Sequence, residues 1–193
     1  MPKPRARADL REQILQAALG LFSSRGYRGT TLRAVASAVG VDVALIAHYF
    51  GNKDGLFRAA VSSIAHTPEA LAECLTPPQA TQGRRLATAY LGLWEDPATG
   101  PTVCAIVRAA IGDDDELARA RDVLLGIARH PRLSEAIAGR EHGFMLALGQ
   151  LLGVAIQRHL VRFAPLTPEA LPLEQLVALV APAVQSSLEA RPD

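Results

Sequence analysis

Apolar residues recur at helical spacing along almost the whole chain, whereas the strict alternation of a half-buried strand is nearly absent. Leu32, Val35, Ala36 and Val39, for example, fall at i, i+3, i+4 and i+7 and predict a short helix with one buried face. Capping residues, glycines and prolines separate such stretches. The pattern therefore predicts an all-α protein of about nine helices.

Four helices are expected in the first third of the chain. The first spans about residues 9–24, with Asp9 as its cap and Gly26 as its end. The next three begin at the capping residues Thr30 or Thr31, Asp42 and Asn52. Five further helices are expected near residues 79–95, 101–111, 114–129, 134–162 and 168–189, the last one started by the run Thr-Pro-Glu.

The second and third helices are short and are joined by a turn at Gly40, which is the pattern of a helix-turn-helix. Its inner positions account for the apolar side chains, and small and polar residues remain on its outer face. Small side chains let the backbone approach a groove wall, while hydroxyl, imidazole and cationic groups contact phosphate. The expected DNA contacts are Thr31, Arg33, Asp42, Val43, Ala44, Ala47, His48, Tyr49 and Lys53.

Asp42 has two possible roles. Its carboxylate can cap the third helix, which is the role we favour, or it can accept from a cytosine amino group in the major groove.

Charge is distributed unevenly along the chain. Net charge is +1, but residues 1–62 carry nine Lys and Arg against four Asp and Glu, a local balance of +5. The remaining residues, 63–193, are acidic. This asymmetry indicates that only the basic N-terminal part of the chain contacts a polyanion. The basic run at residues 3–7 is expected to be a disordered tail, with a minor-groove arm as the alternative.

The stretch TTLRAVASAVGVDVALIAHYFGNKDGLF, residues 30–57, resembles the tetracycline-repressor-like (TetR) transcriptional regulators. The matching positions include Thr31, Gly40-Val41, His48-Tyr49-Phe50 and Lys53. The resemblance implies an N-terminal three-helix DNA-binding head, residues 1–51, joined to a larger C-terminal helical bundle for effector binding and dimerisation, residues 52–193. It also implies a homodimer, double-stranded operator DNA and a small-molecule effector as partners.

Two further features bear on that resemblance. Many members have a tyrosine where this chain has Ala47, so one phosphate contact is missing or is covered by His48 and Tyr49. The C-terminal run GQLLGVAIQRHLVRFAPLTPEAL resembles the ending of one TetR branch, which favours Gly-x-x-x-x-Arg-x-x-x-x-x-x-Pro-Leu.

Aromatic, sulfur-containing and polar side chains on otherwise apolar helices are candidates for an effector pocket, with ordinary core packing as the alternative for each. They are Tyr90, Trp94, Cys104, Arg108, His142, Phe144 and Met145. Dimerisation is expected through the last two helices, which combine glycines with aliphatic stripes.

Several other classes are disfavoured. No signal peptide is expected, and the most apolar window, residues 146–156, is expected to be too short to cross a bilayer, so we expect a cytoplasmic protein without a membrane partner. Two cysteines, Cys74 and Cys104, are too few for a disulfide framework. We favour the interpretation that both are small buried apolar residues over the interpretation that they form a redox pair. No catalytic, cofactor or zinc motif is present, and the acidic run at residues 113–116 fits a helix start better than a metal site.

The sequence thus predicts a ligand-responsive transcriptional regulator, a repressor that a small apolar effector releases from its operator. The alternative is a helical ligand- or partner-binding module without DNA binding. A small helical enzyme is the third possibility, but Glu141 and His142, its loose acid–base candidates, are adjacent and so point to different helix faces.

Overall fold

The chain folds as an all-α protein of two compact units. The computed structural model describes residues 4–64, 67–112, 117–118, 121–122, 125–126 and 128–191. These residues hold ten α-helices and no strand, which confirms the all-α prediction of about nine helices. The first unit comprises residues 1–66 and 101–124, and the second comprises residues 67–100 and 125–193.

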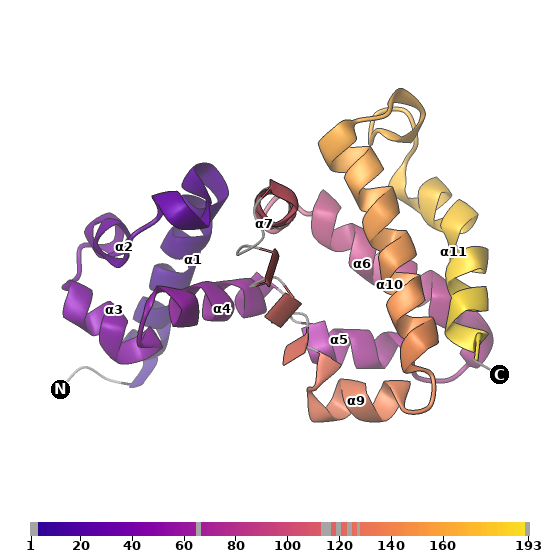
Figure 1. The fold of residues 1–193 in the computed structure, drawn as a ribbon, viewed down its shortest axis with the longest axis horizontal. Coiled ribbons are helices and arrows are strands. Elements are labelled where there is room, and N and C mark those ends of the chain that lie inside the picture. The colour runs from indigo at the N-terminus through magenta and orange to yellow at the C-terminus, as the bar shows by residue number, and fades with distance from the viewer. Residues whose placement is uncertain are drawn as a thin grey trace. The chain divides into compact units, whose positions relative to one another are not determined.

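The first unit, called the head from here on, has one apolar core and extends beyond residues 1–51. It contains α1 (Pro4–Gly29), α2 (Leu32–Val39), α3 (Val43–Phe50), α4 (Lys53–Ile64) and nearly all of α7 (Gly100–Gly112) (Figure 1). Core side chains come from all four N-terminal helices: Ile14, Leu15, Phe22, Val35, Ile46, Leu56 and Phe57 are among them. Val103 and Ile106 of α7 pack against the same core.

An aromatic cluster joins α4 to the end of α1. The rings of Phe22 and Tyr27 are stacked at 5.9 Å, and Phe57 meets them edge-on at 5.0 Å and 5.3 Å. Such edge and offset contacts add to the apolar burial of the rings. The cluster fixes the orientation of α4 against α1.

The start of α1 differs from the sequence prediction. The helix begins at Pro4, not Asp9, so residues 4–7 are helical and not a disordered tail. Proline is tolerated in the first turn because its missing N–H would be unpaired there anyway. Asp9, the predicted cap, therefore lies inside the helix, and Glu12 Oε1 accepts from Gln16 Nε2 at 2.9 Å. The predicted break at Gly26 is confirmed by a φ of 69°.

The second unit contains α5 (Thr67–Cys74), η1 (Gln79–Thr81), α6 (Gln82–Glu95), α9 (Pro131–Ile137), α10 (Glu141–Ala155), η2 (Ile156–Val161), η3 (Ala164–Leu166) and α11 (Leu173–Glu189). Helices α6, α10 and α11 lie side by side in it (Figure 1). Glycine makes this close packing possible: a Cβ on Gly83 would lie 2.6 Å from Gln185 N, and one on Gly143 would lie 2.3 Å from the Ser187 carbonyl oxygen.

Two helix boundaries of the second unit were predicted wrongly. The single helix expected over 134–162 is split between α9 and α10, where Gly139 adopts a φ of 73°. The last helix begins at Leu173 and not near Pro168, because Thr167–Leu171 forms a separate turn. Pro172 disfavours helical geometry at Leu171 and so ends that turn. The helix expected over 114–129 lies largely outside the described residues.

The apolar helical stretch Glu141–Val161 is longer than the sequence window suggested. At 21 residues with a mean hydropathy of 1.4, it meets the length and composition of a membrane-spanning helix among the described residues. The same stretch, however, packs Phe144, Ala147, Leu151 and Ala155 inside its own unit. Core helices of water-soluble proteins meet the same criteria, so the stretch is weak evidence for a membrane.

Candidate nucleic-acid interface

Helices α2 and α3 form a helix-turn-helix. The Thr31 Oγ1 accepts from the Ala34 amide at 3.1 Å and caps α2, which then ends at Gly40 with a left-handed φ of 76°. The chain bends by 113° between the two helices, within the roughly 90–120° of this motif. Val35, Ala36 and Ile46 are buried and hold both helices on the head.

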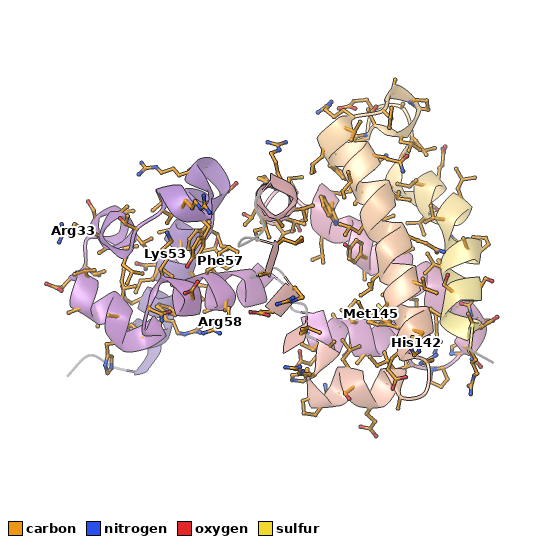
Figure 2. All side chains as sticks on the ribbon, viewed as in Figure 1. Arg33, Lys53, Phe57, Arg58, His142 and Met145 are labelled. Atoms are coloured by element: carbon orange, nitrogen blue, oxygen red, sulfur yellow. The ribbon has the colours of Figure 1, made fainter. Side chains whose placement is uncertain are left out.

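The opposite face of this pair carries the residues expected to meet DNA. Seven of the nine expected residues are exposed: Thr31, Arg33, Asp42, Val43, Ala44, Ala47 and His48. Figure 2 shows Arg33 on the outer side of α2, pointing away from the rest of the head. Tyr49 is half-buried and packs against the head core, with the His48 ring 5.8 Å away. The structure therefore leaves seven of the nine expected residues accessible on the helix-turn-helix, and their contacts with DNA stay predictions.

Asp42 acts as the cap of α3. Its Oδ1 accepts from the Ala44 amide at 2.7 Å. This contact satisfies an amide that would otherwise be unpaired, and it favours the capping role over base readout. It also fixes the residue that follows, Val43, at the first position of α3.

Lys53, the ninth expected residue, is held at the start of α4. Its ammonium lies 4.2 Å from the centre of the Tyr27 ring, and the Tyr27 hydroxyl donates to Asp54 Oδ1. The predicted cap is confirmed, since Asn52 Oδ1 accepts from the Gly55 amide at 2.8 Å. The cation–π contact orients the half-buried Lys53 side chain.

In the second unit, Tyr90 and Trp94 lie together on α6. Burial raises the pKa of Tyr90 to about 12, although the indole N–H of Trp94 donates to its oxygen and opposes the rise. Trp94 is 4% exposed, and its ring stacks on that of His159 at 5.8 Å. Two of the seven expected effector residues thus share one aromatic cluster.

A buried ionic network lies beside that aromatic cluster, and it was not among the sites predicted from the sequence. Arg158 is 1% exposed and donates through Nε to Glu95 Oε1 at 2.5 Å. Its Nη1 donates to the carbonyl oxygens of Leu166 and Leu171, at 2.5 Å and 2.8 Å. Its Nη2 is buried without a hydrogen-bond partner among the described residues. The Gly-x-x-x-x-Arg-x-x-x-x-x-x-Pro-Leu run was the pattern that could have pointed to this residue.

His159 borders the same network. Its Nε2 lies 3.6 Å from Glu95 Oε1, and its side chain is 12% exposed. Burial lowers the pKa of His159, the Glu95 carboxylate opposes that change, and the positive charges of Arg158 and Arg162 add to it. The imidazole is therefore neutral at pH 7.

The other five expected effector residues are divided between the two units. Phe144 is part of the core of the second unit, whereas His142 and Met145 are exposed on α10 (Figure 2). Cys104 and Arg108 lie on α7, in the first unit. Burial raises the pKa of both free cysteines, Cys74 and Cys104, which disfavours a reactive thiolate at either.

No cluster of metal-ligating side chains occurs among the described residues. The acidic run at 113–116 lies outside them, so its expected role at a helix start stays a prediction.

Known proteins resemble one part of the chain in sequence. The HTH-type transcriptional regulator BetI of Paraburkholderia phymatum is 39% identical over 64 residues, and BetI of Burkholderia cenocepacia is 38% identical over the same length. The matched segment covers 33% of this chain and 33% of each of these relatives.

Solved structures resemble the chain over its whole length. A TetR-family regulator from Streptomyces coelicolor has a TM-score of 0.70 and 28% identity, with 98% of this chain and 99% of that one covered. The fatty acid degradation regulator FadR of Bacillus halodurans has a TM-score of 0.66 at 17% identity, covering 99% of this chain and 100% of its own, and shares the fold.

Two family models account for both parts of the chain. The one described as bacterial regulatory proteins of the tetR family matches residues 14–60, which contain the helix-turn-helix. The one described as the tetracycline repressor-like C-terminal domain matches residues 80–188, more than half of the chain. Members are DNA-binding transcription factors and not enzymes, as the sequence analysis expected. The chain belongs to the tetR family of transcriptional regulators.

Proposed function

We propose that this regulator is a repressor that binds operator DNA as a homodimer and leaves it when a small, mainly apolar effector binds. The observation that carries the proposal is the helix-turn-helix, whose outer face is free of the head's own packing. A reading head of this kind needs its second helix accessible to the major groove. We also expect the regulator to act in the cytoplasm, where operator DNA is found.

The expected DNA-contact residues divide into two kinds. Thr31, Arg33, His48, Tyr49 and Lys53 carry hydroxyl, imidazole or cationic groups and suit phosphate oxygens, which position the head without reading sequence. Val43, Ala44 and Ala47 of α3 suit the base edges, while Asp42 caps the helix. The +5 balance of residues 1–62 supports binding to a polyanion.

The outer faces of α10 and α11 support a homodimer. Met145 and Leu146 on α10 are 53% and 59% exposed, and Leu179 on α11 is 69% exposed. Gly149, also exposed on α10, leaves room for another helix to approach. Large apolar residues exposed on neighbouring helices fit a subunit interface. Two heads then read two half-sites about 34–36 Å apart, or a multiple of that distance.

The effector is proposed to bind within the second unit, at the helices that carry Tyr90 and Trp94. Effector contacts by the other five candidate residues stay predictions: Cys104, Arg108, His142, Phe144 and Met145. The Tyr90–Trp94 pair offers an aromatic surface, and Arg158 Nη2 offers a buried donor without a partner among the described residues. An apolar molecule that carries one hydrogen-bond acceptor suits this combination. The effector acts if it binds the DNA-releasing state more tightly than the DNA-binding state. We propose that α4, which Phe57 packs against Phe22 and Tyr27 of α1, transmits the change.

The test is titration of the purified protein onto its own promoter region at several salt concentrations. Specific binding that weakens as salt rises is expected. Replacing Arg33 or Lys53 by alanine should weaken binding and lower the salt slope by about 1 for each lost phosphate contact. Arg84→Ala, at an exposed arginine of α6 outside the head, is the matched control.

The same titration distinguishes a DNA-binding regulator from the alternative, a helical ligand- or partner-binding module without DNA binding. If the protein shows no DNA preference at any salt concentration, or if the Arg33 and Lys53 variants bind like the Arg84 variant, the head is a docking surface and not a DNA reader.

A further inference from the structure

We propose that α3 reads its operator mainly through the 5-methyl groups of thymine, which contact the side chains of Val43, Ala44 and Ala47. This inference rests on the proposed function, since it names the feature of DNA that the same surface recognises. It begins from the three apolar residues that α3 turns to solvent. Val43 is 37% exposed, and both alanines are exposed, whereas Ile46 of the same helix is 0% exposed.

These three side chains form one continuous apolar patch. Val43 and Ala47 are four residues apart, and Ala44 and Ala47 are three apart, so their Cβ atoms are neighbours on the helix surface. Single exposed apolar residues are common and need no explanation. Here, however, the patch occupies the reading face of a helix-turn-helix in a chain whose family binds DNA.

The side chains that usually make bidentate contacts to bases are missing from this helix. Arginine and lysine pair with guanine, and asparagine and glutamine pair with adenine. The sequence of α3, VALIAHYF, contains none of the four. One Asp42 carboxylate oxygen is engaged by the Ala44 amide at 2.7 Å, which leaves His48 as the exposed polar side chain within α3. A single imidazole cannot distinguish several base pairs.

An apolar side chain can still distinguish base pairs. In the major groove, thymine presents a methyl group, whereas cytosine presents an amino donor that an apolar contact would leave without a partner. Short side chains also let the helix backbone approach the base edges closely. Val43 is the first residue of α3, and the N-terminal residues of a recognition helix are those that contact bases.

The consequence is measurable, because uracil differs from thymine in duplex DNA by the methyl group alone. Burying one methyl group is worth about fourfold in affinity, from about 0.8 kcal/mol per buried carbon. If each of two heads contacts one methyl group, uracil in place of thymine should weaken binding about fifteenfold.

The experiment begins with duplexes that the full-length protein selects from a random library. Each selected duplex is synthesised with thymine and with uracil, and both affinities are measured at one salt concentration for wild type, Val43→Ala and Val161→Ala. Val161 is 54% exposed on η2, outside the reading face, and so supplies the same substitution as a control. Alanine favours helix more than valine does, so the Val43 variant should keep α3 intact.

We expect wild type and Val161→Ala to prefer thymine by the same factor and Val43→Ala to prefer it by a smaller one. Equal affinity of wild type for both duplexes would overturn the inference while leaving specific DNA binding established. An unchanged preference in Val43→Ala would overturn it too, since the methyl group would then act through DNA shape. If no duplex is enriched in the selection, the proposed function itself fails.

Discussion

Replacement of Arg158 by methionine tests the buried network of the second unit. Methionine keeps the length and much of the volume of the side chain, so the change removes the guanidinium and leaves only a small cavity. Three contacts are lost: the ion pair with Glu95 and the hydrogen bonds to the carbonyl oxygens of Leu166 and Leu171. These contacts join the end of α6 to the segment between η2 and α11.

The expected loss follows from the surroundings of each partner. Loss of each carbonyl contact costs about 1 kcal/mol, because both leucines are half-buried and water can reach them in part. The Glu95 side chain is 22% exposed, so the carboxylate loses its partner at a cost of about 2 kcal/mol and not the full penalty of a buried charge. The substitution also removes the buried, unpaired Nη2, which stabilises the folded state by about 1 kcal/mol. The net destabilisation is about 3 kcal/mol.

Urea unfolding followed by the fluorescence of Trp94, the one tryptophan of the chain, measures this loss close to the network. With a slope of about 2 kcal/mol per molar urea, the midpoint should fall by about 1.5 M. Arg162→Asn is the matched control, because Arg162 is 64% exposed in its pair with Glu169 and has a φ of 57° that asparagine tolerates. Its midpoint should stay unchanged, as exposed pairs contribute little.

A double-mutant cycle with Glu95→Gln separates the ion pair from the carbonyl contacts. We expect Arg158→Lys to fall between wild type and Arg158→Met, since lysine keeps the charge but not the forked geometry of the guanidinium. The reasoning is refuted if Arg158→Met shifts the midpoint no more than Arg162→Asn does.

Three further changes test other parts of the structure. Gly143→Ala places a Cβ 2.3 Å from the Ser187 carbonyl oxygen, so α10 and α11 must move apart. The melting temperature should fall by an amount equivalent to about 1–3 kcal/mol of stability. An unchanged melting temperature would contradict the close packing of the two helices. Asp42→Ala removes the cap of α3 and should cost about 1 kcal/mol in urea unfolding, whereas Asp42→Asn should keep most of it; equal losses in both would show that capping is not the role of Asp42. Because the folded-state pKa of His159 lies below its ordinary value of 6.5, the unfolded chain binds the proton more tightly, and stability should fall as the pH is lowered from 6.5 through the folded-state pKa. The melting temperature of His159→Gln should therefore fall less between pH 7.5 and 5.5 than that of wild type, and parallel pH profiles would rule this out.

The head was predictable because its determinants are local. Thr31, Gly40, Asp42 and Asn52 act on amides or turns within three residues of themselves, and the structure shows each of them doing so. Helical periodicity also separated buried Val35, Ala36 and Ile46 from the exposed face. The DNA-binding assignments of individual residues stay predictions, although the exposure of seven of the nine agrees with them.

The two wrongly predicted helix boundaries, at Gly139 and at Leu173, lie where one local signal favours a helix and another ends it. Gly139 was passed over within a long apolar stretch, because periodicity continues on both sides of the break. Thr167 and Pro168 form a good helix start by composition, yet Pro172 four residues later limits that helix to one turn.

The sequence by itself determined the all-α class, the helix-turn-helix and the family, since caps, turns and periodicity depend on neighbours a few residues away. Only the tertiary structure decided that Val103 and Ile106 pack on the head core, that Lys53 lies over Tyr27, and that Arg158 pairs with Glu95, 63 residues before it. Periodicity shows which face of a helix is buried but not which helix covers it. Those pairings follow from the packing of whole helices, where close approach at glycines such as Gly83 and Gly143 selects the neighbours.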